Sequence, residues 1–221
     1  MIWPGVSLLP RTGSYVPNLD EAGRLHMLTF QQPYGSACVD GPKRAENRTW
    51  RVSKHLWGRA LWVGVHAGLG WYDGADASIQ HWRAMPGTDH RSPDYRAWPT
   101  APSTRNGYPK ACLLGFVRVV GCYDLEEVAA LAVGRKVASA SLRAEAQRTM
   151  GAMRAWAFGP VVWRLDPVAI RLPKPIPVPR GALGLWALDD GRAKMPVELQ
   201  ATIRRALVSC LYNRETWRIA A

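Results

Sequence analysis

Short apolar stretches with the two-residue period of β-strands constrain the fold of this 221-residue chain most strongly. The clearest is 59–67 (RALWVGVHA), where Leu61, Val63 and Val65 share one face and Trp62, Gly64 and His66 share the other. Further extended stretches are expected at 24–29, 44–50, 111–123, 159–172 and 182–188. The chain lacks the regular strand–helix rhythm of a parallel sheet. The pattern therefore predicts an α+β fold: a small, mixed, partly open β-barrel surrounded by short helices.

Helix signals are few and mostly short. Pro33 is compatible with a helix start and Gly41-Pro42 with its end, which predicts a helix at 34–39. Two helical turns are expected at 75–83, and Asp124 predicts the cap of a helix that a second one follows at 139–156. From Pro196 onward leucine and isoleucine recur every four residues, which predicts a C-terminal helix docked on the barrel or on a second subunit.

These elements suggest three parts of the chain. Residues 1–25 are expected to form an irregular arm, 26–190 the main domain, and 191–221 a helical extension. The main domain contains a predicted loop insertion at about 68–107, and its proline-rich segment 173–181 is expected at a sheet edge or rim. Gly64 and Gly115 interrupt apolar strands, which indicates a bulge or a close approach of other atoms.

The charge balance is strongly basic. Lysine and arginine number 29 against 17 acidic residues, a net charge of +12, and there are 11 tryptophans. This composition favours a polyanionic partner, most simply RNA or DNA, and the arginine–tryptophan-rich insertion suits a single strand. Two alternatives stay open: the composition equally fits a GC-rich genome, and the insertion's tryptophans can pack on the domain.

Several classes of protein are not indicated by the sequence. The four cysteines form no CxxC pair, which predicts reduced thiols and no structural zinc. Motifs for phosphate loops, dinucleotides, zinc proteases and serine hydrolases are missing, so no cofactor and no metal are expected. No apolar run reaches the roughly 18 residues of a membrane helix, and the first residues do not resemble a signal peptide. We therefore predict a cytoplasmic protein without membrane contact; its oligomeric state stays open.

The most distinctive charged stretch is Gly41–Arg51 (GPKRAENRTWR). In an extended chain Glu46 and Arg48 point to the same face, and Lys43 lies in the preceding turn, from which it can swing to either face. An ammonium, a carboxylate and a guanidinium would then meet at the mouth of one sheet. The alternative is a solvated surface ion-pair cluster. His66 is likewise either a pocket residue or a histidine simply hydrogen-bonded in its strand.

Three motifs occur in order. The first is Gly41-x-Lys43-x-x-Glu46-x-Arg48, preceded by Gln32-Pro33-Tyr34 and followed by a strand that ends in His66-Ala67-Gly68. The second is Tyr108-Pro109 before the strand at 112–115, and the third is GPVVW at 159–163 with PV at 177–178 and GALGLW at 181–186. Together they span about residues 26–189 and resemble the ASCH domain (activating signal cointegrator 1 homology) of the PUA-like superfamily.

The resemblance implies a β-barrel with helices around it and a cleft that contains the first motif. ASCH domains are thought to bind RNA or DNA, and some members are ribonucleases or amidohydrolases that deacylate modified cytidine. In the amidohydrolase type the residue matching Lys43 is catalytic and a threonine occupies the position of Glu46.

Three functions follow as alternatives. A nucleic-acid-binding module would use Lys43, Arg48 and Arg51 on phosphates, Trp50 or Trp62 for stacking, and Glu46 and Gln32 on base edges. Its ligand would be RNA or DNA, single-stranded or carrying a modified base. The full set of predicted nucleic-acid contacts is Gln32, Tyr34, Lys43, Glu46, Arg48, Trp50, Arg51, Trp62, Tyr108 and Lys110. A hydrolase would use Lys43, Glu46 and His66. In the third alternative the charged cluster only fixes the helix to the sheet, and function depends on a protein partner.

Overall fold

The computed structural model describes residues 24–40, 43–53, 61–84, 101–126, 159–212 and 217–219. Its strands are β1 (His26–Gln32), β2 (Ala45–Arg48), β3 (Leu61–Trp71), β4 (Cys112–Asp124), β5 (Val161–Pro177), β6 (Leu185–Ala187) and β7 (Trp217–Ile219). Its helices are α1 (Tyr34–Val39), α3 (Ala75–Ala84) and α6 (Val197–Tyr212), with a 3-10 turn at Arg105–Gly107. The predicted α+β class, with a mixed sheet and few helices, is confirmed.

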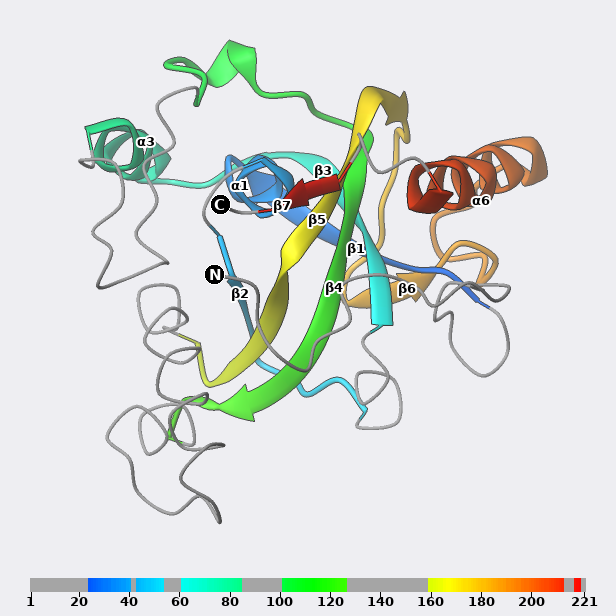
Figure 1. Ribbon diagram of the computed structural model, residues 1–221, viewed down its shortest axis with the longest axis horizontal. Helices are drawn as coiled ribbons and strands as arrows, with labels where there is room; N and C mark the ends of the chain where they lie inside the picture. The colour runs from blue at the N-terminus through cyan, green and yellow to red at the C-terminus, as the bar shows by residue number, and fades with distance from the viewer. Residues whose placement is uncertain are drawn as a thin grey trace.

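One seven-stranded sheet organises the described residues, in the order β2-β5-β4-β3-β1-β6 with β7 alongside β5. β1 and β3 run parallel, and the other pairs are antiparallel. The sheet is open, but it curls: Arg48 of β2 donates from Nη2 to the backbone oxygen of Thr29 in β1 at 3.2 Å, although these strands are not neighbours. Figure 1 shows the long β4 and β5 crossing the molecule, with α3 and α6 on opposite sides.

Apolar side chains fill both faces of the curled sheet. The inner face buries alternate residues of β1, β3 and β5, among them Leu28, Val65 and Trp163. The outer face buries the residues between them, such as Met27 and Trp62. Helix α6 covers this outer face with Ile203 and Leu207, which are 0% and 1% exposed. The predicted docking of the C-terminal helix on the sheet is confirmed. Apolar residues recur about every four positions along α6, so they share the one face that packs on the sheet.

At both strand glycines, Gly64 and Gly115, atoms of a neighbouring strand approach the backbone closely, as predicted from their positions in apolar strands. A side chain at Gly64 would overlap the sulfur of Met27, which lies directly over the glycine. At Gly115 the register of β4 against β5 shifts between Leu113 and Gly115, and an added Cβ would overlap the backbone oxygen of Ile170. Gly115 therefore marks a bulge at which two strand backbones approach each other.

Four expectations about element bounds are corrected by the structure. The strand expected at 24–29 runs from His26 to Gln32, so Gln31 and Gln32 belong to β1. Residues 68–71, assigned to the loop insertion, continue β3 because Trp71 pairs with Gln32. Residues 173–177, expected in a link, continue β5, and the C-terminal extension contains β7 as well as a helix. The arm at 1–23, most of the expected helices between 124 and 156, and 85–100 of the insertion lie outside the described residues.

The proline-rich end of β5 stays paired because its prolines alternate. Pro173, Pro175 and Pro177 all lack an N–H on the same side of the strand. Pairing with β4 continues through Ile176 opposite Leu113, and the N–H of the following Val178 donates to Ala111 at 2.8 Å. The strand can therefore continue through three prolines.

All four cysteines are buried and none is in a disulfide bond, in line with the predicted reduced thiols. Among the residues described, none of the helices has both the length and the apolar composition needed to cross a membrane.

Candidate functional site

A cleft of 720 Å³ opens where β2, the end of β3 and residues 182–184 meet. The residues that line it are Thr29, Phe30, Gln31, Tyr34, Lys43, Glu46, Asn47, Arg48, Gly68, Leu69, Gly70, Tyr72, Gly159, Ala182, Leu183 and Gly184. The motif of residues 41–48 thus contributes Lys43, Glu46 and Arg48 to a single concave site.

The charged cluster, defined as Lys43, Glu46 and Arg48, forms the floor of this cleft. Glu46 Oε2 accepts from Lys43 Nζ at 2.5 Å, and its Oε1 lies 2.8 Å from Nη2 of Arg48. Lys43 is placed by α1, since its N–H donates to Ala37 at 3.1 Å, and Nζ also donates to the oxygen of Ala45. Glu46 and Arg48 share a face of β2, as the strand period predicts. Lys43 and Glu46 are only 3% and 8% exposed, so the cluster is not a solvated surface pair.

The cluster has hydrogen-bonding capacity that the described residues do not use. A lysine ammonium has three donors, and Lys43 makes only two hydrogen bonds in this part of the chain. The buried Nε of Arg48 has no acceptor among the described residues. Each carboxylate oxygen of Glu46 accepts one cation and retains a lone pair. With two cations and one anion, the floor can bind an electron-rich group while accepting one further donor.

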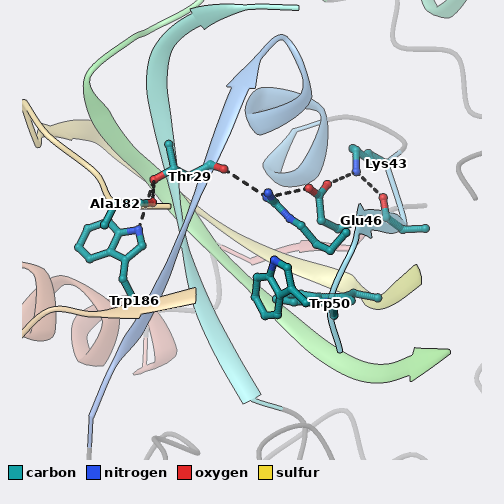
Figure 2. A network of polar contacts seen from close by, with 9 residues as sticks. Thr29, Lys43, Glu46, Trp50, Ala182 and Trp186 are labelled. Carbon is teal, nitrogen blue, oxygen red and sulfur yellow. Dashed lines mark hydrogen bonds and ion pairs between the residues drawn. The ribbon is translucent and has the colours of Figure 1, made fainter. Parts of the chain in front are cut away.

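A chain of hydrogen bonds joins the floor to the far wall (Figure 2). It runs from Glu46 through Arg48 to the backbone oxygen of Thr29, at 3.2 Å. The hydroxyl of Thr29 donates to Ala182 at 3.1 Å and accepts from the indole N–H of Trp186 at 3.2 Å. Thr29 therefore holds residues 182–186 at a fixed position relative to the cluster.

The walls of the cleft combine one predicted residue, Tyr34, with three that the sequence did not single out, Tyr72, Leu69 and Leu183. Tyr34 lies edge-on to Tyr72 with ring centroids 5.0 Å apart, and Lys43 Nζ is 5.9 Å from the Tyr34 ring. Leu69 and Leu183 are 70% and 92% exposed at the rim. The sequence pattern that could have pointed to these two exposed leucines is a leucine next to glycine, in Gly68-Leu69-Gly70 and again in Leu183-Gly184.

Three predicted contacts are too buried for the roles given to them. Trp62 is 0% exposed beneath the outer-face core, so it cannot stack on a base. Gln32 is also 0% exposed; its amide nitrogen donates to Pro109 at 2.6 Å and its oxygen accepts from the Ser36 N–H at 3.1 Å. Tyr108 is 3% exposed, its hydroxyl donates to Pro102, and burial raises its pKa to about 12.

The remaining predicted contacts lie outside the cleft lining. Arg51 makes an exposed, two-armed ion pair with Asp124. Trp50 is partly buried, with its ring edge-on to Trp163 at 4.7 Å. Lys110 is partly buried just before β4. The site that the structure assembles is therefore narrower than the predicted set.

His66 lies behind the cleft rather than in its lining. The ring is 2% exposed, and Nε2 is 2.9 Å from the oxygen of Val178, which fixes the proton on Nε2 because a carbonyl only accepts. Nδ1 faces the Thr29 hydroxyl at 3.2 Å. Gly181 passes so close that a Cβ there would lie 2.5 Å from Nδ1. His66 thus holds Val178 through Nε2 and packs against Thr29 and Gly181, and it is not placed to exchange protons with a ligand.

We predict that the protein loses stability in mild acid because of His66. Burial lowers the pKa of His66 below 6.5, so the unfolded chain binds a proton on this residue at a higher pH than the folded chain does. Its contribution to the free energy of unfolding is complete above pH 6.5 and decreases as the pH falls below that value. Melting curves at about pH 7.5 and about pH 5.5 should show a larger loss for the wild type than for His66→Gln. Equal losses in the two proteins would contradict this assignment.

Two other kinds of chemistry find no support at this site. Cys38 lies beneath the cluster, but burial raises its pKa to about 12, so it is not a thiolate nucleophile. Within the described ranges, no three or more His, Cys, Asp or Glu side chains are grouped to hold a metal ion. No protein-family model matches this chain, and a search of curated proteins finds no significant match.

Proposed function

We propose that this chain is a nucleic-acid-binding protein of the ASCH type, with a PUA-like fold, and that its cleft receives one nucleotide of an RNA or DNA strand. The observation that carries the proposal is the charged cluster at the floor of the cleft, with an unused donor on Lys43. The three charged residues that define the first ASCH-like motif are the same three that build this floor.

The charge and the walls also support a nucleic-acid ligand. A net charge of +12 attracts a polyanion over the whole surface. Within the cleft, Tyr34 and Tyr72 supply flat rings beside the charged floor. Aromatic rings next to cations are typical of sites that hold single-stranded nucleic acid. The exposed guanidinium of Arg51 is available for a flanking phosphate by exchange with Asp124.

We predict that Lys43→Met weakens the binding of a short oligonucleotide by about tenfold, because one charge-assisted hydrogen bond is lost. Methionine retains the length and apolar stem of lysine, so the cleft keeps its shape. Fluorescence anisotropy with a labelled single strand measures the change. Wild-type affinity should also fall steeply as salt rises, because binding releases counterions from the strand.

The matched control is Lys174→Met, which removes the same charge from an exposed position outside the cleft lining. It should weaken binding only slightly, through the overall charge. Equal losses in the two variants would show that binding is not centred on the cleft. Failure of the wild type to bind any oligonucleotide at low salt would refute the proposed function.

A hydrolase is the second candidate, and one observation favours it: a buried lysine in contact with a carboxylate faces the cleft. Such a pair is able to activate water or to stabilise a developing negative charge. However, both oxygens of Glu46 already accept from cations, and His66 lies outside the cleft lining. We therefore rank binding first; the Glu46 variant described in the Discussion separates the two.

A further inference from the structure

Leu183 is the most exposed large apolar residue in the described part of the chain, at 92%. It lies at the rim of the cleft, and Leu69, at 70% exposure, lines the same cleft from the end of β3. Single exposed leucines are common on protein surfaces. Two of them line one cleft with a charged floor, so a ligand in that cleft would lie beside exposed apolar side chains.

The segment that presents Leu183 is held firmly by hydrogen bonds. Thr29 donates to the oxygen of Ala182 at 3.1 Å. Arg192 donates to the backbone oxygens of Leu183 and Leu185 at 3.4 and 2.6 Å. The Nε of Arg192 also donates to the carboxylate of Asp190 at 2.7 Å, which fixes the guanidinium. Gly184 then turns the chain with a φ of +74°. The exposed position of Leu183 is thus built into the backbone.

The floor is chemically suited to the edge of a base rather than to a phosphate. A phosphate would meet the carboxylate of Glu46, which lies between the two cations. The edge of a neutral base offers carbonyl or ring-nitrogen acceptors beside amino donors. An acceptor would meet the unused donor of Lys43, and a donor would meet a remaining lone pair of Glu46. The cleft volume of 720 Å³ lies within the range of small-molecule sites.

We infer that the cleft takes a single unstacked nucleobase, with its edge on the charged cluster, and that Leu183 packs against the next base of the strand. This inference rests on the proposed function and adds which part of the nucleotide enters. A leucine that covers the face of a neighbouring base replaces the stacking that the strand loses when one base leaves it.

Two measurements on the full chain test this inference. In the first, thermal shift is recorded with each common nucleoside and with inorganic phosphate at equal concentration. At least one nucleoside should raise the melting temperature, phosphate should not, and Lys43→Met should remove the effect. In the second, Leu183→Ser should weaken oligonucleotide binding about fivefold, from lost apolar contact, and should weaken nucleoside binding clearly less. The control is Val197→Ser, an equally apolar position 73% exposed on α6, which should change neither.

The outcomes separate this inference from the function on which it rests. If oligonucleotides bind in a Lys43-dependent way but phosphate stabilises the protein as well as nucleosides do, the floor is a phosphate site and the inference fails alone. It also fails alone if Leu183→Ser behaves like Val197→Ser, or if Leu183→Ser weakens nucleoside binding equally. If no oligonucleotide binds the wild type, the proposed function fails and this inference fails with it.

Discussion

Gly115→Val is expected to destabilise the protein by about 4 kcal/mol or more, one of the largest effects of any single substitution in this chain. An added Cβ would overlap the backbone oxygen of Ile170 and lie 3.1 Å from Cα of Arg171. Both atoms belong to the β5 backbone, so no side-chain rotation relieves the clash. For a chain of this length the melting temperature should fall by roughly 8–16 °C, or the variant should be insoluble.

Gly70→Val is the matched control, with the same substitution in the neighbouring strand. The nearest atoms to a new Cβ there belong to the exposed Gln31 side chain, the closest at 3.2 Å. That side chain can move, and valine is favoured in strands. The control should therefore stay within about 1 kcal/mol of the wild type. A Gly115→Val protein that melts together with the control would show that the β4 bulge tolerates a side chain.

The comparison of Gly115 with Gly64 shows what a sequence can predict about such positions. Both residues interrupt apolar strands, so a bulge or a close approach was predicted for each. Which atoms approach depends on partners distant in the sequence: the Met27 side chain at Gly64, and the β5 backbone at Gly115. The sequence therefore located the constrained positions, but not how much each substitution costs.

The central parts of the strands were predictable because their apolar alternation is local. The ends were not, since they depend on pairing with distant partners. β3 continues to Trp71 beside Gln32, and β5 continues through prolines beside β4. β7 has three residues, too few for a period to be seen, and it exists through pairing with β5. In each case tertiary pairing extended an element beyond its own sequence signal.

The floor of the candidate site could be predicted from the sequence, whereas its walls could not. Lys43, Glu46 and Arg48 lie within six residues, so turn and strand geometry alone brings them together. The walls come from the end of β3 and from residues 182–184, which only the curl of the sheet places beside β2. The stacking role of Trp62 was inferred from residue type, but α6 and its neighbours cover the outer face and bury that ring.

Glu46→Gln is expected to lower the free energy of unfolding by about 3–5 kcal/mol, because it leaves two buried cations without their shared anion. In the wild type each oxygen of Glu46 contacts one cation, at 2.5 Å to Lys43 and 2.8 Å to Arg48. The glutamine side chain has one accepting oxygen, and its amide group would point donors at the other cation. Asp124→Asn is the control, since it breaks the half-exposed pair with Arg51 and should cost less than about 1 kcal/mol.

The same variant separates binding from catalysis. In a binding site the ligand's acceptors replace part of the lost negative charge, so an oligonucleotide should raise the melting temperature of Glu46→Gln more than that of the wild type. Affinity of the folded variant should stay close to that of the wild type, because the glutamine oxygen still accepts a hydrogen bond from a base. In a hydrolase the variant would keep affinity and lose most of its rate, since glutamine cannot transfer a proton. A variant as stable as Asp124→Asn would show that the cluster is not a buried ion triad. Loss of oligonucleotide binding at a temperature where the variant is folded would show that the carboxylate itself is required for recognition.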